Sequence, residues 1–99
     1  MTSPIVVGLS HRTAPMGLLE QAAMTAQDCR ALETRLCSGE AVVEAVVLST
    51  CNRLEVYATV SRFHGGLAAV GEALAESSGV DLPDLTDHLY VHYEDAAVA

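Results

Sequence analysis

Residues 41–60, AVVEAVVLSTCNRLEVYATV, predict two β-strands joined by a short polar link. The run Ala41 to Leu48 is apolar except for Glu44, which is typical of a buried strand. The run Leu54 to Val60 alternates apolar and polar residues, which predicts a strand with one face in water. The link Ser49–Arg53 holds no Gly, Pro or Asp, the residues favoured by a simple turn. We therefore interpret it as a candidate site at the end of a strand.

Two strands and three helices are expected around this pair. The run Ile5–Leu9 predicts a first strand, and Thr13 is expected to cap a short helix that has Pro15 near its first turn and ends near Ala23. The other expected elements are a helix Ala26–Cys37 capped by Thr25 and Asp28 and ended by Gly39, a helix Leu67–Ser77 opened by Gly65 and Gly66 and ended by Gly79, a loop Asp81–Asp84, and a strand His88–Tyr93.

This order of elements predicts an α+β fold. Strand, helix, strand, strand, helix, strand is the split βαβ pattern of a ferredoxin-like sandwich with an antiparallel four-stranded sheet, to which the short helix after the first strand is an addition. We expect residues 1–99 to form one domain. The last residues, Glu94–Ala99, resemble a helix start that nothing ends, which indicates the N-terminal piece of a longer protein.

The composition narrows the class of protein. The net charge is −8, and the five basic residues are all arginines, so non-specific binding to phosphate backbones is disfavoured. No apolar run approaches the roughly 20 residues that span a bilayer, and the start lacks the features of a secretory signal. Three cysteines without a signal favour a reducing compartment, which by default is the cytoplasm.

Cys51 is the candidate nucleophile, because a thiolate attacks carbonyl carbons well. Arg53 is suited to a carboxylate, or else to a surface ion pair, and His11 and Arg12 are expected near Cys51 if the first two strands lie side by side. The alternative for Cys51 is a buried, inert thiol. Cys29 and Cys37 follow a helical pattern and are expected in the core.

Neither a metal site nor a nucleotide site is expected in these residues. His88 and His92 are expected on one face of the last strand, but two histidines are too few for a closed site, and a third ligand would have to be Cys51 or His64. Gly65 and Gly66 lack the spacing of a phosphate-binding loop.

Two segments carry a family resemblance. Residues 8–15, GLSHRTAP, and residues 49–57, STCNRLEVY, resemble the two signature segments at the start of glutamyl-tRNA reductase. Leu89–His92 with Ala97 and Val98 resemble that family's next segment. The resemblance covers the whole chain and implies a ferredoxin-like N-terminal catalytic domain, in agreement with the order of elements.

The resemblance implies NADPH-dependent reduction of glutamyl-tRNA to glutamate-1-semialdehyde, the first step of tetrapyrrole synthesis from glutamate. Cys51 matches the nucleophile that forms a thioester. The segment Thr50, Cys51, Asn52 and Arg53 matches the lining of the glutamate pocket, where Arg53 would pair with the side-chain carboxylate. The family's important histidine would follow Ala99, so His92 is not its match. The NADPH-binding domain and the helix that makes the full-length protein a homodimer are missing, and this piece alone is expected to lack reductase activity.

Two other functions stay open. One is a thiol-dependent hydrolase of activated esters, which needs a base near Cys51, with His11 the best candidate. The other is a non-catalytic ferredoxin-like interaction domain in which Cys51 is buried.

Overall fold

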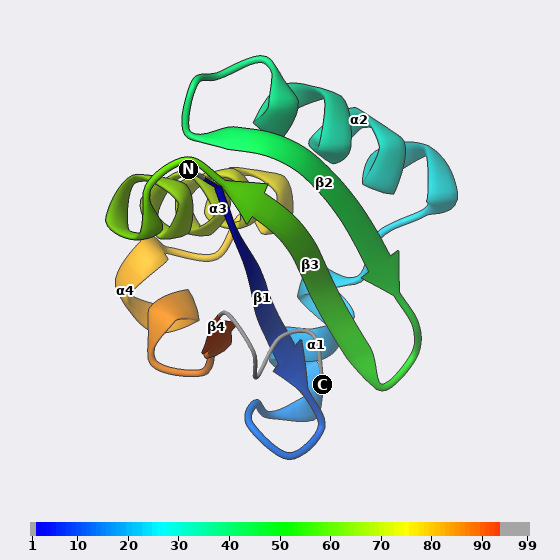
Figure 1. Cartoon of the computed structure of the whole chain (residues 1–99). Helices are drawn as coiled ribbons and strands as arrows, with labels where there is room; N and C mark the ends of the chain where they lie inside the picture. The colour runs from blue at the N-terminus through cyan, green and yellow to red at the C-terminus, as the bar shows by residue number, and fades with distance from the viewer. Residues whose placement is uncertain (1, 94–99) are drawn as a thin grey trace.

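A computed structural model of the chain describes residues 2–93, which form a four-stranded sheet with helices (Figure 1). The elements are β1 (Ser3–Ser10), α1 (Met16–Ala22), α2 (Ala26–Cys37), β2 (Val42–Ser49), β3 (Arg53–Val60), α3 (Phe63–Ser78), α4 (Leu82–Thr86) and β4 (Tyr90–Tyr93). The strand order is β2-β3-β1-β4, and every neighbouring pair is antiparallel. This is the predicted ferredoxin-like arrangement, so the α+β fold is confirmed.

The core lies between one face of the sheet and the helices. Alternate residues of β1 and β3 point into it, and the buried sides of α2 and α3 complete it. The core side chains from these four elements are Ile5, Val7, Leu9, Leu54, Val56, Ala58, Val60, Cys29, Leu32, Leu36, Val70, Ala73 and Leu74. The opposite face of the sheet is open within the described residues, and Val46, Leu48 and Tyr57 are exposed there.

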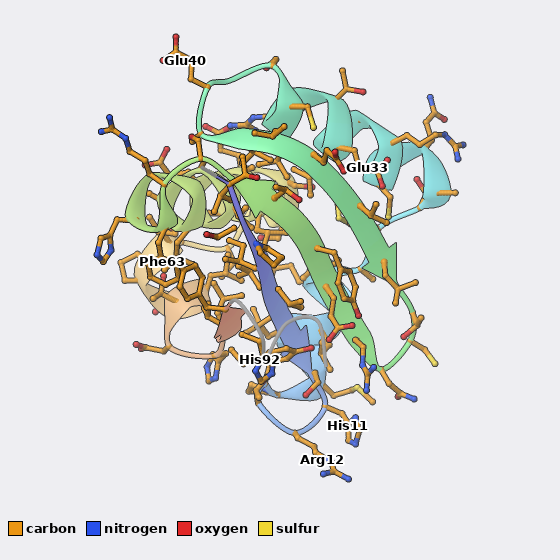
Figure 2. The ribbon with its side chains drawn as sticks, viewed as in Figure 1. His11, Arg12, Glu33, Glu40, Phe63 and His92 are labelled. Carbon is orange, nitrogen blue, oxygen red and sulfur yellow. The ribbon has the colours of Figure 1, made fainter. Side chains whose placement is uncertain are left out.

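The prediction that β2 is the buried strand of the pair is wrong. β2 lies at the edge of the sheet, and Val43, Val46 and Leu48 are each more than two-fifths exposed. β3 is the central strand, because β1 pairs along its other side. The edge is partly covered by α2, where a Glu33 carboxylate oxygen accepts the Val47 N–H at 2.8 Å (Figure 2).

The predicted capping of α2 is confirmed. The Thr25 hydroxyl accepts the Asp28 N–H at 3.0 Å, and the Asp28 carboxylate accepts the Thr25 N–H at 3.2 Å. These reciprocal bonds satisfy two of the free donors at the start of the helix. Gly79 ends α3 with a positive φ of 74°, as its end signal predicted.

Thr13 does not cap the first helix, which begins after Pro15. Its hydroxyl instead accepts the Ser10 N–H at 3.0 Å and lies 3.3 Å from the Ser10 carbonyl oxygen. The Thr13 hydroxyl therefore stabilises the loop after β1 and not the start of the helix, as the sequence had suggested. α1 is correspondingly shorter than expected.

Three other boundaries differ from the sequence prediction. α3 begins at Phe63, so Gly65 and Gly66 lie inside it and do not open it. The expected loop Asp81–Asp84 forms most of α4, which has a proline in its first turn. β4 begins at Tyr90, so His88 lies outside the strand.

The expected helix start at Glu94–Ala99 lies outside the described residues. Within residues 2–93, the helices are too short or too polar for any of them to cross a membrane.

Candidate functional site

The link between β2 and β3 is a tight hairpin with Cys51 and Asn52 at its tip. The Thr50 N–H donates to the Arg53 carbonyl oxygen at 2.8 Å and closes the hairpin. The Thr50 hydroxyl accepts the Asn52 N–H at 3.3 Å. Thr50 thus holds the backbone on both sides of Cys51, so the thiol stands on an ordered turn.

The three cysteines have different surroundings. Cys51 is exposed, which contradicts the reading in which it is a buried thiol. Cys29 is buried in the core as predicted, but Cys37 is exposed, so its assignment to the core is wrong. Cys37 follows Leu36 by one residue, about 100° around the helix from the buried face.

The loop after β1 lies beside this hairpin. The His11 N–H donates to the Asn52 carbonyl oxygen at 3.0 Å, and Ser10 is the partner of Arg53 in the β1–β3 pair. His11 and Arg12 therefore lie at the end of the sheet where β2 turns into β3 (Figures 1 and 2). The first two strands do not lie side by side, which was the condition set for this approach; instead β3 lies between β1 and β2 and itself brings the loop to the hairpin.

A buried carboxylate lies on the open face of the sheet, next to Arg53. Glu55 is only 7% exposed, and its two oxygens accept hydrogen bonds from the Tyr57 hydroxyl, at 2.6 Å, and from the Tyr90 hydroxyl. Arg53 Nη1 lies 3.8 Å from Glu55 Oε1. This cluster does not follow from the sequence pattern. Alternation along β3 placed Arg53, Glu55 and Tyr57 on one face, but Tyr90 comes from another strand.

The cluster favours the ionised form of Glu55. Burial by itself raises the pKa of Glu55, but the hydrogen bonds from Tyr57 and Tyr90 and the nearby Arg53 guanidinium outweigh it and hold the pKa below its ordinary value. Burial and the bond to Glu55 raise the pKa of Tyr90. The bond to Glu55 and burial likewise raise the pKa of Tyr57. Both phenols therefore stay protonated as donors.

Arg53 keeps most of its guanidinium available to a ligand. Its side chain is about half exposed, and its contact with Glu55 is long and involves Nη1 alone. A planar guanidinium edge binds a carboxylate through two parallel hydrogen bonds. Arg53 is therefore suited to an anionic group approaching the open face near Cys51.

The histidines of the last strand do not form the pair that the sequence suggested. His88 lies before β4, and its Nδ1 is 3.1 Å from the Thr13 carbonyl oxygen. Within residues 2–93, no three His, Cys, Asp or Glu side chains gather as metal ligands would.

The described residues do not fit a dinucleotide. Their sheet is antiparallel, whereas the dinucleotide-binding fold uses a parallel sheet with a glycine-rich turn. Gly66, the second glycine of the Gly65–Gly66 pair, lies inside α3 against the Val60 side chain and forms no such turn.

Comparison with known proteins gives one consistent family. The family model described as "Glutamyl-tRNAGlu reductase, N-terminal domain" matches residues 7–99. Curated proteins named glutamyl-tRNA reductase from Frankia alni and Streptomyces avermitilis are 53% and 52% identical over 96 residues, which is 97% of this chain. One from Kineococcus radiotolerans is 53% identical over 94 residues, or 95% of the chain. The chain spans only 20%, 17% and 21% of these three relatives.

A solved structure described as a dimeric ferredoxin-like protein from an uncultured marine organism aligns with 95% of this chain and 85% of its own. Its sequence identity is 13% and the TM-score is 0.43.

Proposed function

Because the chain belongs to the glutamyl-tRNA reductase family, as its N-terminal domain, we propose that it performs the acyl-transfer half of the reduction of glutamyl-tRNA to glutamate-1-semialdehyde. This reduction is the step that begins tetrapyrrole synthesis from glutamate. The observation that supports the assignment is the exposed Cys51 thiol at the tip of an ordered hairpin, within the segment that matches the family signature.

The proposed reaction is attack of Cys51 Sγ on the ester carbonyl of glutamyl-tRNA. A carbon–sulfur bond forms, the bond from the carbonyl carbon to the ribose oxygen breaks, and the thiol proton leaves with the ribose hydroxyl. The product is a glutamyl thioester on Cys51 and free tRNA. A thioester presents an electrophilic carbonyl that a hydride can reduce, which releases the aldehyde and regenerates the thiol.

The neighbouring residues have binding roles in this proposal. Arg53 pairs with the side-chain carboxylate of the glutamyl group, since its guanidinium edge is free on the open face. Thr50 fixes the turn that presents Cys51, and Asn52, whose N–H the Thr50 hydroxyl accepts, would contact the bound glutamyl group. His11 and Arg12 lie near enough to the hairpin to border the bound ester.

The hydride donor is NADPH in this proposal, and its binding belongs to the part of the longer family members that this chain does not span. Dimerisation of the full-length protein and most contacts to tRNA are assigned to the same part. A free thiol nucleophile suits a reducing compartment, so we place the protein in the cytoplasm.

The test is intact mass spectrometry of the chain after brief incubation with glutamyl-tRNA. We expect an added mass of one glutamyl group that hydroxylamine or excess thiol removes. Cys51→Ser should abolish the adduct. Cys37→Ser is the matched control, because Cys37 is also exposed but lies at the end of α2, and this variant should keep the adduct.

Absence of the adduct from a folded chain would contradict the proposal. Release of free glutamate on repeated turnover, without a reductant, would instead favour an ester hydrolase. Within residues 2–93, the bond that ties His11 to the hairpin comes from its backbone N–H, and no hydrogen bond joins its ring to Cys51 as the hydrolase alternative would need.

A further inference from the structure

We infer that Glu55, braced by Tyr90 across three strands, is a positioning residue that aims Arg53 at the side-chain carboxylate of the substrate. The inference rests on the proposed function, because it takes Cys51 as the acyl acceptor and Arg53 as the carboxylate ligand. The residues that would make Arg53 selective for a substrate carboxylate are Glu55, Tyr57, Tyr90 and Gly8.

The hydrogen bond from Tyr90 to Glu55 crosses the sheet from β4 over β1 to β3. Gly8 on β1 is the register partner of both Glu55 on β3 and Tyr90 on β4. The Tyr90 ring therefore has to pass over Gly8 to donate its hydroxyl to Glu55. A Cβ at Gly8 would lie 2.8 Å from the Tyr90 Cζ and hydroxyl oxygen and 2.9 Å from the Leu54 carbonyl oxygen, so only glycine leaves the path clear.

The hydroxyls of Tyr57 and Tyr90 limit how Glu55 can interact with Arg53. Each carboxylate oxygen already accepts a hydroxyl, one from Tyr57 and one from Tyr90. Glu55 thus attracts Arg53 by charge at 3.8 Å but does not bind it as a bidentate pair. The guanidinium is held over the open face while its hydrogen-bonding edge stays free for a ligand.

Arg53 lies close enough to Cys51 for an acyl group on the thiol to contact it. Arg53 is the first residue of β3, two residues from the thiol at the hairpin tip, and shares its strand face with Glu55. An acyl group on Cys51 that bears a distal carboxylate can reach it, whereas the corresponding amide offers no negative charge. The cluster therefore favours acyl groups that end in a carboxylate.

The test compares two small acyl donors, the α-benzyl thioesters of glutamate and of glutamine, which differ only in the distal carboxylate and amide. Transfer to Cys51 is followed by intact mass spectrometry, and the ratio of the two rates is the readout. For the unchanged chain we expect the glutamate donor to react about tenfold faster or more, as expected for one charge-assisted interaction.

Glu55→Gln keeps the shape of the side chain and removes its charge, so we expect the ratio to fall about tenfold, chiefly through a slower reaction of the glutamate donor. Tyr90→Phe removes one hydroxyl and should lower the ratio in the same direction. Glu44→Gln is the matched control, because Glu44 is an exposed carboxylate on the same face of the sheet, on β2, and should leave the ratio unchanged.

Three results in folded variants would overturn the inference. A ratio that Glu55→Gln leaves unchanged would show that Glu55 does not act on Arg53. An increased ratio would show that Glu55 competes with the ligand, and an equal loss of rate with both donors would indicate a structural role alone. Failure of the unchanged chain to prefer the glutamate donor, or to react at all, would instead contradict the proposed function and the inference with it.

Discussion

At the residue scale, Glu55 is a carboxylate that is buried and yet charged. Its oxygens have lost most of their contact with water, and two phenolic hydroxyls replace it. An unpaired ion in this position would be strongly destabilising, and neither tyrosine can be removed without exposing that penalty. The charge of Glu55 therefore contributes to stability, in addition to the role that we infer for it beside Arg53.

The charge of Glu55 makes stability depend on pH. Its folded-state pKa is below the ordinary 4.5, so the stabilisation is fully present above about pH 5 and is lost as the pH falls through the folded-state pKa. We expect Glu55→Gln to lower the free energy of unfolding by about 1–3 kcal/mol at pH 7. The gap between the two proteins should narrow on acidification.

Urea unfolding followed by circular dichroism at several values between about pH 7 and about pH 3 measures this gap. Glu44→Gln serves as the exposed control and should differ little from the unchanged chain throughout. A gap for Glu55→Gln that stays constant with pH would contradict the role given to its charge.

At the scale of elements, α3 approaches β3 closely through one glycine. A Cβ at Gly66 would lie 2.3 Å from Val60 Cγ1 and 2.5 Å from Val60 Cβ, and Val60 is fully buried. Val60 is β-branched and lies in a packed core, so it has no other low-energy rotamer that would avoid this contact. The helix can therefore rest on the sheet at this distance only while residue 66 has no side chain.

The adjacent glycine provides a matched comparison. A Cβ at Gly65 would meet nothing nearer than the Ala41 Cβ at 3.9 Å. We expect Gly66→Ala to destabilise the chain by about 2 kcal/mol from overpacking. Gly65→Ala should be neutral or stabilising by up to about 1 kcal/mol, since alanine favours the helix.

Thermal and urea unfolding of the two single variants test this difference. Equal effects would show that the contact between α3 and β3 yields easily and that Gly66 is not required by packing.

At the scale of the whole molecule, the net charge of the chain and the local charge of Arg53 have opposite effects on the binding of a negatively charged ligand. The net charge of −8 repels nucleic acid at long range, whereas the half-exposed Arg53 on the open face of the sheet is the group proposed to bind the substrate locally. Under the proposed function, binding of glutamyl-tRNA by this domain should therefore depend on the aminoacyl group more than on the RNA.

We expect tRNA that carries no amino acid to bind this chain with a dissociation constant above about 100 µM at physiological salt. This is weaker than ordinary non-specific binding. Fluorescence anisotropy with end-labelled tRNA measures it. Micromolar binding that weakens steeply with added salt would show that a local basic surface overcomes the net charge.

The sequence predicted the strands and helices in their order, except for α4, and it indicated the candidate thiol. Hydrophobic periodicity and capping residues are local signals, so the helix Ala26–Cys37 and the strands on either side of Cys51 followed from them. Boundaries were less secure where a side chain had two possible partners. Thr13 is the clearest case, because its hydroxyl binds the backbone of Ser10 and leaves the helix start to Pro15.

Strand position and the Glu55 cluster were decided by tertiary structure alone. An apolar run indicates a strand but not its place in the sheet, so β2 was expected in the interior although it forms an edge. The bond from Tyr90 to Glu55 joins residues 35 positions apart and depends on the register of three strands at Gly8. The sequence by itself determined which side chains share a face of a strand, since that follows from the twofold repeat of the backbone. Only the folded sheet determined which strands are neighbours, because pairing is a long-range choice that minimises exposed apolar surface across the whole molecule.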